Sequence, residues 1–402
     1  MRTDYAVIAI GASVLLGVLF GAVLALDDGA PADDLTVEWV GDIQTAYGQN
    51  HHQVAVATVG EAPVIAAPVN DLDDVDFCGI AAYDADGQVR WHAPLSVDAC
   101  NPHAIGDVGV ADRADGESPA FLAITAERVV AAFDGDDGER TLERPVDSIG
   151  YSAPAVADVT GDGIEEIVAV DFEGSVHVVR PDGSLVWDRD LDGRTWADPI
   201  VTDVTGDGET EIAVAHGFGH VTVLDREGSV LWQVDLDRPI TAWTAIERDA
   251  GVDLVAATRA DTVLALDPEG RTRWSTSVEG ATSVGDPDGT RVYVGDGTGT
   301  VSALDLEDGS IEWRRTIVED VRVEAPAIGD VTGDGSPELV AVARDGTVSV
   351  LEPATGDELA RHELDDPIYV SPTLADVTGD GADDVVLLFG DGRVALLAVP
   401  DG

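Results

Sequence analysis

Residues 152–191 read SAPAVADVTGDGIEEIVAVDFEGSVHVVRPDGSLVWDRDL, and residues 197–236 repeat this stretch without a gap as ADPIVTDVTGDGETEIAVAHGFGHVTVLDREGSVLWQVDL. A third copy occupies residues 325–364, and a fourth begins at residue 371. Each complete copy contains four short runs rich in β-branched and apolar residues, separated by turn signals such as PDG at 181–183. A repeat of about 40 to 50 residues with four strands per unit is typical of a β-propeller.

The number of units follows from the fourth strand of each. Looser copies fill residues 241–278 and 281–318, and two divergent units cover roughly 50–95 and 101–144. The same fourth-strand position is held by Trp91, Trp187, Trp232, Trp274 and Trp313, and by Leu142 and Ala360 in two other units. The last unit stops after its third strand, and LTVEWV at 35–40 places Trp39 in that position. We therefore expect an all-β fold of about eight four-stranded blades closed by this N-terminal strand, or seven blades if one divergent unit is not a blade.

The charge of the chain is extreme. Acidic residues number 78 against 22 basic ones, all of them arginine, and the net charge is -56. Hydrophobic residues make up 45% of the chain, so it has enough apolar surface to fold. A surface of excess carboxylate stays soluble where salt screens repulsion over about 3 Å at molar ionic strength. This composition resembles that of proteins from extreme halophiles, and it argues against binding to nucleic acid.

The N-terminus predicts a membrane anchor. Residues 5–26 form an apolar run without a charge, long enough to span a bilayer core of about 30 Å. Arg2 precedes the run and acidic residues follow it, which favours a cytoplasmic N-terminus. We expect a cytoplasmic tip (1–4), a transmembrane anchor (5–26), a linker (27–34) and an extracellular propeller (35–402). A cleaved signal peptide is the alternative.

Two family resemblances rest on short motifs. ALDLEDGSIEW at 303–313 resembles the tryptophan-docking motif of PQQ-like, or quinoprotein-type, propeller repeats. DVTGDG followed by an acid resembles the calcium loop of FG-GAP repeats, the integrin-α-like or VCBS type. The resemblance implies a propeller over about 35–402. It implies little about function, because PQQ-like repeats occur in dehydrogenases and in non-enzymatic scaffolds.

The DVTGDG loops are candidate calcium sites. Calcium takes several hard oxygen ligands around one point, with a glycine where the loop turns sharply, and an acid-rich loop with this spacing supplies both. We expect weak structural Ca²⁺ sites whose dissociation constants are about 10⁻⁴ to 10⁻³ M; acidic turns without an ion are the alternative. The expected ligands are Asp158, Thr160, Asp162 and Glu166; Asp203, Thr205, Asp207 and Glu211; Asp330, Thr332, Asp334 and Glu338; and Asp376, Thr378, Asp380 and Asp384.

A second candidate site lies where fourth strands connect to first strands, near the central channel. Aligning the repeats puts His103 and Trp243 at a position held by proline in four other units. The expected ligand-binding residues are His51, His52, His103, Tyr151, Trp196, Trp243 and Tyr369. They suit a peptide, a glycan or a small molecule, and histidines from neighbouring blades also suit a transition metal. The alternative is that these side chains plug the channel.

The chain contains two cysteines. Cys78 and Cys100 would close a loop with a sequence separation of 22 if the domain is extracytoplasmic, and the alternative is two buried free thiols.

The sequence favours a non-enzymatic function. No GxSxG or HExxH motif is present, and no adjacent cysteine pair or lysine supports a PQQ cofactor. We expect a scaffold or a module that binds a protein or glycan partner. The alternatives are a glycan-active propeller of the polysaccharide lyase type and a PQQ-dependent oxidoreductase.

Overall fold

The computed structural model describes residues 35–41, 43, 49–70, 78–96, 98, 100–101, 103–112, 118–248 and 250–400. The chain divides into two units, Met1–Ala32 and Asp33–Gly402. The expected anchor at 5–26, its flanking segments at 1–4 and 27–34, and the signal-peptide alternative all lie outside the described residues. Within those residues, no helix has the length and apolar character needed to cross a membrane.

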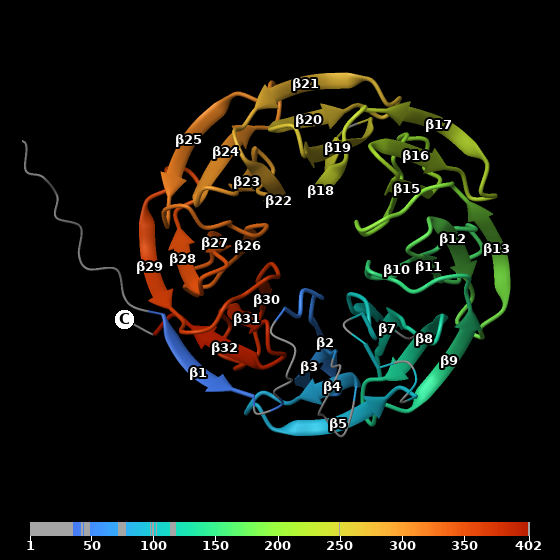
Figure 1. Cartoon of the computed structure of the whole chain (residues 1–402), viewed down its shortest axis with the longest axis horizontal. Coiled ribbons are helices and arrows are strands. Elements are labelled where there is room, and N and C mark those ends of the chain that lie inside the picture. Colours follow the sequence, from blue (N-terminus) through green and yellow to red (C-terminus); the bar gives the residue numbers. More distant parts are fainter. Residues whose placement is uncertain are drawn as a thin grey trace, which may run out of the picture. The chain divides into compact units, whose positions relative to one another are not determined.

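The described residues of the second unit form eight four-stranded sheets, which are arranged as blades around a common axis (Figure 1). Blade 1 contains β2 (Ala55–Val59), β3 (Ala62–Val69), β4 (Gly79–Tyr83) and β5 (Val89–Pro94). Blade 2 contains β6 (Gly109–Ala111), β7 (Ala120–Ile124), β8 (Val129–Asp134) and β9 (Arg140–Pro145). Blade 3 contains β10 (Ala155–Ala157), β11 (Glu166–Val170), β12 (Ser175–Val179) and β13 (Leu185–Asp190). Blade 4 contains β14 (Ile200–Thr202), β15 (Glu211–His216), β16 (His220–Leu224) and β17 (Val230–Asp235).

The other half of the ring follows the same order. Blade 5 contains β18 (Ile240–Arg248), β19 (Gly251–Thr258), β20 (Thr262–Leu266) and β21 (Thr272–Ser277). Blade 6 contains β22 (Ala281–Pro287), β23 (Arg291–Asp296), β24 (Thr300–Asp305) and β25 (Ile311–Thr316). Blade 7 contains β26 (Ala327–Gly329), β27 (Glu338–Val342), β28 (Thr347–Leu351) and β29 (Glu358–Glu363). Blade 8 contains β30 (Thr373–Ala375), β31 (Asp384–Leu388), β32 (Val394–Ala398) and β1 (Thr36–Val40).

Each of the first seven blades is an antiparallel meander, and blade 8 takes its outer strand from the other end of the chain. β1 pairs antiparallel with β32, so that Thr36 lies opposite Ala398 and Val40 opposite Ala395. The prediction of an all-β propeller with eight four-stranded blades is confirmed, and the seven-blade alternative is wrong.

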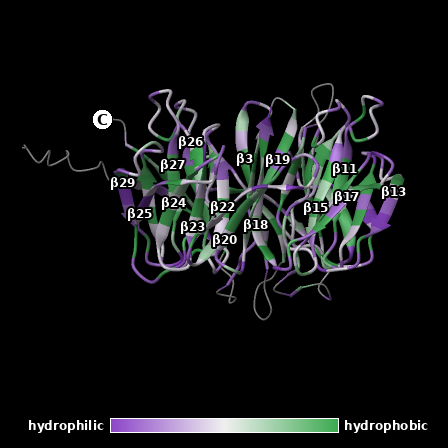
Figure 2. Cartoon of the chain, turned by 90° about the horizontal axis from the view of Figure 1, so that it is seen from above, coloured by the Kyte–Doolittle hydropathy of each residue, from purple (hydrophilic) through white to green (hydrophobic). Residues whose placement is uncertain are grey.

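The hydrophobic core lies between neighbouring blades. The second and third strands of blade 3, β11 and β12, are buried along their whole length, because each face packs on another sheet. One cluster joins Val168 and Val178 of blade 3 to Ile212 and Leu224 of blade 4. Apolar residues concentrate in these inner strands, whereas the loops are mostly hydrophilic (Figure 2).

A fourth-strand tryptophan fastens six of the eight blades to the next one, and Leu142 and Ala360 hold this position in blades 2 and 7. Each indole Nε1 donates a hydrogen bond of 2.8–3.0 Å to a backbone carbonyl of the following blade. The pairs are Trp39 with Ala85, Trp91 with Gly135, Trp187 with Arg226, Trp232 with Pro268, Trp274 with Leu306, and Trp313 with Pro353. At Gly270, whose φ is +79°, a Cβ would lie 2.7 Å from a Trp232 ring carbon, so both the turn and the ring require glycine.

Candidate functional site

The four DVTGDG loops connect the first and second strands of blades 3, 4, 7 and 8, and all four are held by their own acids. In the loop of blade 4, Asp203 accepts hydrogen bonds from the backbone N–H groups of Gly206, Asp207 and Gly208 at 2.7–3.0 Å. The last acid of the motif, Glu211, is buried and accepts from the N–H of Thr205 at 3.0 Å and from its hydroxyl at 3.3 Å. A side-chain oxygen that caps several N–H groups fixes the turn without any ion.

The loop of blade 3 contains its own cation. Arg180, in the turn after β12, donates a hydrogen bond of 2.7 Å to Asp162 and lies 3.7 Å from Glu166. The hydrogen bond from Arg180 is the main reason that the pKa of Asp162 lies below its usual range. Glu166 is fully buried and also accepts from the N–H groups of Val159 and Thr160, both at 3.1 Å. A guanidinium therefore stands beside the acids of this loop.

The loops of blades 4 and 7 bring three acids together, and no arginine is paired with those acids among the described residues. One oxygen from each of Asp203, Asp207 and Glu211 lies within 4.8 Å of the others, and the same holds for the group Asp330, Asp334 and Glu338. Burial raises the pKa of Glu211, and Asp207 and Asp203 add repulsion. Burial likewise raises the pKa of Glu338. In the blade 7 loop, the buried Oδ1 of Asp330 makes no hydrogen bond to any residue that the structure describes.

The loop of blade 8 resembles these two less closely. Its last acid is Asp384, which accepts from the N–H groups of Val377 and Thr378, both at 2.8 Å. Burial raises the pKa of Asp384. Asp376 caps Gly379 at 2.7 Å, but the acids of this loop do not form a group of three oxygens within the 4.8 Å range.

Blade 5 lacks the motif but keeps a buried acid at the start of its second strand. Asp253 is fully buried and pairs with Arg248 at 2.9 Å and with Arg273 at 2.8 Å. In this blade, as in blade 3, arginine compensates the acid next to the first turn.

The second candidate site brings the three predicted histidines together beside blades 1 and 2. The ring centroids of His51 and His52 are 4.5 Å apart, and His103 lies 5.4 Å from His51 and 5.9 Å from His52. Tyr151 stacks against this group, with its centroid 4.8 Å from that of His103. Burial, with the neighbouring His52 and His51, lowers the pKa of His103 to about 4, so this imidazole is neutral at pH 7. Burial also lowers the pKa of His51.

The repeat alignment that singled out His103 is off by five positions. Proline directly precedes the first strand in blades such as blade 3, where Pro154 comes before β10, but Val108 is the residue directly before β6. His103 belongs to the connection that precedes β6, and from this connection its ring lies beside those of His51 and His52. Trp243, by contrast, lies in β18 opposite Ala256, in the expected register.

The remaining predicted residues extend the site around the axis. Tyr151 contacts Phe172 at a centroid distance of 4.9 Å, and Phe172 contacts Trp196 at 5.7 Å, edge to face. The indole of Trp243 donates to the carbonyl of Asp198 at 2.9 Å. Tyr369 lies apart from this row, with the Arg344 guanidinium 5.3 Å from its ring centroid.

Sequence reasoning missed two acids near the channel. Asp107 accepts from the N–H of Gln53 at 2.7 Å, and Asp198 accepts from the N–H of Ala153 at 2.7 Å. They line a cleft of about 490 Å³ together with Trp196, Trp243 and Asp286. The protein around Asp198, together with the charge of Asp107, raises the pKa of the Asp198 carboxyl. The side chain itself remains exposed to solvent at the surface of the cleft. The signal that could have found them is an aspartate just before a first strand, as in ADPIV at 197–201.

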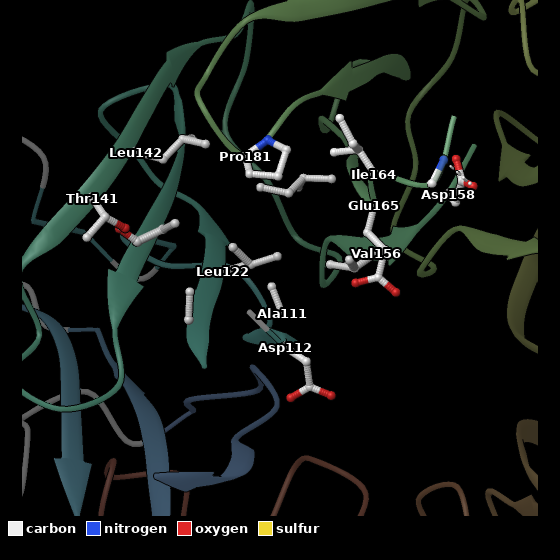
Figure 3. Close-up of a pocket in the computed structure, with 14 residues that line it drawn as sticks. Ala111, Asp112, Leu122, Thr141, Leu142, Val156, Asp158, Ile164, Glu165 and Pro181 are labelled. Atoms are coloured by element: carbon white, nitrogen blue, oxygen red, sulfur yellow. Dashed lines mark hydrogen bonds between the residues drawn. The ribbon is translucent and has the colours of Figure 1, made fainter. Parts of the chain in front are cut away.

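A larger cleft lies between blades 2 and 3, next to the position where a leucine replaces the docking tryptophan. Its volume is about 1110 Å³. Figure 3 shows Leu122, Leu142 and Val156 among its apolar lining residues, with the carboxylates of Asp112 and Glu165 also on its lining. Leu142 approaches the Cβ position of Gly183 only to 3.9 Å, whereas docked indoles come within 3.0 Å of the equivalent glycines. The shorter side chain leaves space that an indole would fill.

Cys78 and Cys100 form a disulfide in the structure, with their Cα atoms 5.8 Å apart. It joins the start of β4 to the connection between β5 and β6, close in sequence to His103. The bond therefore tethers the segment that carries one of the three clustered histidines.

Comparisons with known proteins establish the fold. The family model of the lambda-carrageenase β-propeller domain matches residues 166–275, which is less than half of the chain. No curated protein matches the chain significantly.

Solved structures match over most of the propeller. BamB from Moraxella catarrhalis has a TM-score of 0.65 at 17% identity, covering 90% of this chain and 97% of BamB. Quinohemoprotein alcohol dehydrogenase from Comamonas testosteroni has a TM-score of 0.65 at 12% identity, covering 92% of this chain and 77% of that one. BBS1N, solved in complex with ARL6DN, has a TM-score of 0.55 at 13% identity, covering 73% and 92%. The resemblance to quinoprotein-type propellers is confirmed for the fold.

Proposed function

We propose that this chain is a non-catalytic binding propeller of the cell surface, held at the membrane by residues 5–26 with the propeller outside. The row of aromatic and histidine side chains near the axis supports a binding role, because it gathers large, rigid side chains and polar groups from several blades. The propeller BBS1N forms a complex with another protein, which makes a protein partner a reasonable expectation here. No quinone is part of this proposal.

We further propose that the loops of blades 4 and 7 hold structural Ca²⁺. The observation that carries this proposal is the contrast with blade 3, where an arginine pairs with Asp162 and Glu166. In the part of the chain that the structure describes, the three clustered acids of the other two loops have no such partner, and Arg226 pairs instead with Glu209 at the edge of the blade 4 loop. Calcium neutralises clustered carboxylates and takes oxygen ligands at 2.3–2.6 Å. The strongly acidic chain attracts cations over its whole surface. We expect Ca²⁺ to bind first at the loops of blades 4 and 7, because their carboxylates lie closest together.

A thermal melt of the full chain in molar KCl tests the calcium proposal. An ion that binds only the folded state stabilises it by about 0.4 to 1.4 kcal/mol per site at 1 mM if its Kd is about 10⁻³ to 10⁻⁴ M. We expect millimolar Ca²⁺ to raise the midpoint relative to EGTA, and the rise to shrink in Asp207→Ala and Asp334→Ala. Asp162→Ala is the matched control and should keep the full calcium response. No shift in the wild-type chain would contradict the proposal.

A glycan-active propeller is the second candidate, because the carrageenase propeller model matches residues 166–275. The direct test is to incubate the protein with lambda-carrageenan and measure both retention on the polymer and the release of reducing or unsaturated ends. Retention without release supports a binding module. Release that disappears in His52→Ala would replace the binding proposal by catalysis at the histidine group.

A further inference from the structure

We propose that His51, His52 and His103 form a site for a single divalent transition metal ion, for which Zn²⁺ is the best fit. One ring nitrogen from each lies within 4.8 Å of the other two. The site goes beyond the proposed calcium loops, because it uses nitrogen rather than oxygen ligands and lies in a different part of the propeller.

The hydrogen bonds of His51 and His52 fix which nitrogen each of them offers. Nδ1 of His51 lies 3.0 Å from the carbonyl oxygen of Gln49, and a carbonyl only accepts, so Nδ1 carries the proton and Nε2 offers its lone pair. Nδ1 of His52 lies 3.2 Å from Oδ1 of Asp107, which is likewise an acceptor when ionised. Both rings therefore present Nε2. This arrangement, with the far ring nitrogen bonded to a carboxylate or a carbonyl, is typical of histidines that bind metals.

Two of the ring nitrogens are buried without a partner. His52 is 1% exposed, and its Nε2 makes no hydrogen bond within the described residues. Nδ1 of His103 is also buried and makes none there. A channel plug built only for packing would not gain from placing unpaired nitrogens side by side, because a buried polar atom without a partner is destabilising. A shared metal ion would satisfy these nitrogens together.

The surrounding groups hold the three rings in place. Asp107, which orients His52, also accepts from the N–H of Gln53 at 2.7 Å and donates its own N–H to the carbonyl of Tyr151 at 3.0 Å. The backbone N–H of His103 donates to Asn101 Oδ1 at 2.8 Å, and the disulfide at Cys100 tethers the same segment. Small side-chain rotations would bring the nitrogens from their present spacing to the roughly 3.3 Å that tetrahedral Zn²⁺ with bonds of about 2.05 Å requires.

Three imidazoles select Zn²⁺ or a similar ion over Ca²⁺, which prefers oxygen. A set of three protein ligands leaves the fourth tetrahedral position for water or for a donor group of a bound partner. Tyr151 covers one side of the group, with its centroid 5.5 Å from that of His52. The metal would thus add a point of attachment for a carboxylate or imidazole at the aromatic row.

Cobalt titration of the metal-free full chain tests the site. Ca²⁺ is kept in excess throughout so that the acidic loops are occupied. We expect one equivalent of Co²⁺ to produce the visible absorption of a tetrahedral nitrogen-ligated ion, and Zn²⁺ to displace it. His52→Ala and His103→Ala should each weaken this binding at least 100-fold. His92→Ala is the matched control, because His92 is an exposed histidine of the same blade, and it should bind as the wild type does.

The variant Asp107→Asn, which changes the group that orients His52 rather than a metal ligand, distinguishes a metal site from general loss of structure. It keeps an acceptor oxygen but loses the charge, and we expect metal binding to weaken about 10- to 100-fold. The thermal midpoint in Ca²⁺ without transition metal shows that each variant is folded, and His103→Gln replaces His103→Ala if the latter unfolds. Failure to bind Co²⁺ stoichiometrically, or binding that survives in the folded histidine variants, would overturn the proposal.

Discussion

The first loops of blades 3 and 4 share the sequence DVTGDG, yet they solve the same electrostatic problem differently. Both bury a glutamate at the start of the second strand, Glu166 in β11 and Glu211 in β15. In blade 3 the turn after the third strand supplies Arg180, whereas the equivalent turn of blade 4 has Asp225. The two turns are superposable in hydrogen bonding, since Arg180 and Asp225 each donate their N–H to a serine carbonyl four residues on. In blade 3 the turn thus supplies an arginine to the motif acids Asp162 and Glu166, whereas Arg226 of the blade 4 turn pairs with Glu209 instead, at 3.0 Å.

The largest effect is expected when the internal cation of blade 3 is removed. Arg180→Met leaves Asp162 and Glu166 without it, and we expect the largest loss of stability in EGTA among these variants, because the buried carboxylate of Glu166 loses the nearby guanidinium. Millimolar Ca²⁺ should restore much of the lost stability. Urea unfolding with and without Ca²⁺ measures both. A loss that calcium does not reverse would show that this loop cannot replace its arginine with an ion.

A smaller effect is expected when the buried acid is neutralised in each loop. Glu166→Gln should destabilise the protein by about 1–2 kcal/mol in EGTA, because Glu166 is a buried carboxylate that faces the partly exposed guanidinium of Arg180. Glu211→Gln should change the stability in EGTA by no more than about 0.5 kcal/mol, because it also relieves repulsion from Asp203 and Asp207. Paired urea melts compare the two. Equal losses would contradict the view that only one of the two glutamates has a cationic partner.

The reciprocal exchange tests blade 4. Asp225→Arg should place a guanidinium near Asp207 and Glu211 and remove that loop from the calcium response, so that the calcium-dependent rise in Tm falls by the share of one site. The change in EGTA should be within about 1 kcal/mol, because the turn loses the Asp225 carboxylate that accepts from Glu227 and Ser229. Asp225→Asn keeps the turn and is the control. An undiminished calcium response in Asp225→Arg would place the ion elsewhere.

The smallest effect is expected in blade 8, where the last acid is the shorter Asp384. Asp384→Glu gives this loop the residue found in blades 3, 4 and 7, and we expect one further weak calcium site with a gain below about 1 kcal/mol at millimolar Ca²⁺. Calcium stoichiometry by equilibrium dialysis measures it. Unchanged stoichiometry would mean that backbone placement, rather than side-chain length, separates blade 8 from blade 4.

The sequence was sufficient for the blades because their signal repeats. Trp187 and Trp232 recur at one position, and each docks on the next blade as an equivalent side chain should. The difference between the loops of blades 3 and 4 was harder to predict from the sequence. Arg180 lies 18 positions after Asp162, and the two side chains meet only in the folded sheet. A comparison of Arg180 with Asp225 in the aligned repeats would have revealed it.

The histidine group was predicted residue by residue but not as a geometry. His103 was assigned to the position that Val108 occupies, because the divergent second unit lacks the proline that marks the first strand elsewhere. Asp107, which orients His52, was missed because the divergent second unit hides that it stands just before a first strand, as Asp198 does in ADPIV. Which ring nitrogens face each other depends on rotamers, and those are set by packing rather than by sequence spacing.

Because β1 pairs with β32, the order of the strands around the ring does not depend on where the chain begins and ends. Thr36 and Ala398 are partners in one sheet although almost the whole propeller lies between them along the chain. A circular permutant that joins residue 400 to residue 35 through a short linker, and opens at the exposed Gly289 turn of blade 6, would draw all four strands of blade 8 from one continuous segment. Its ends would then fall within blade 6, where the pairing of β22 with β23, rather than that of β1 with β32, would join the two ends of the chain.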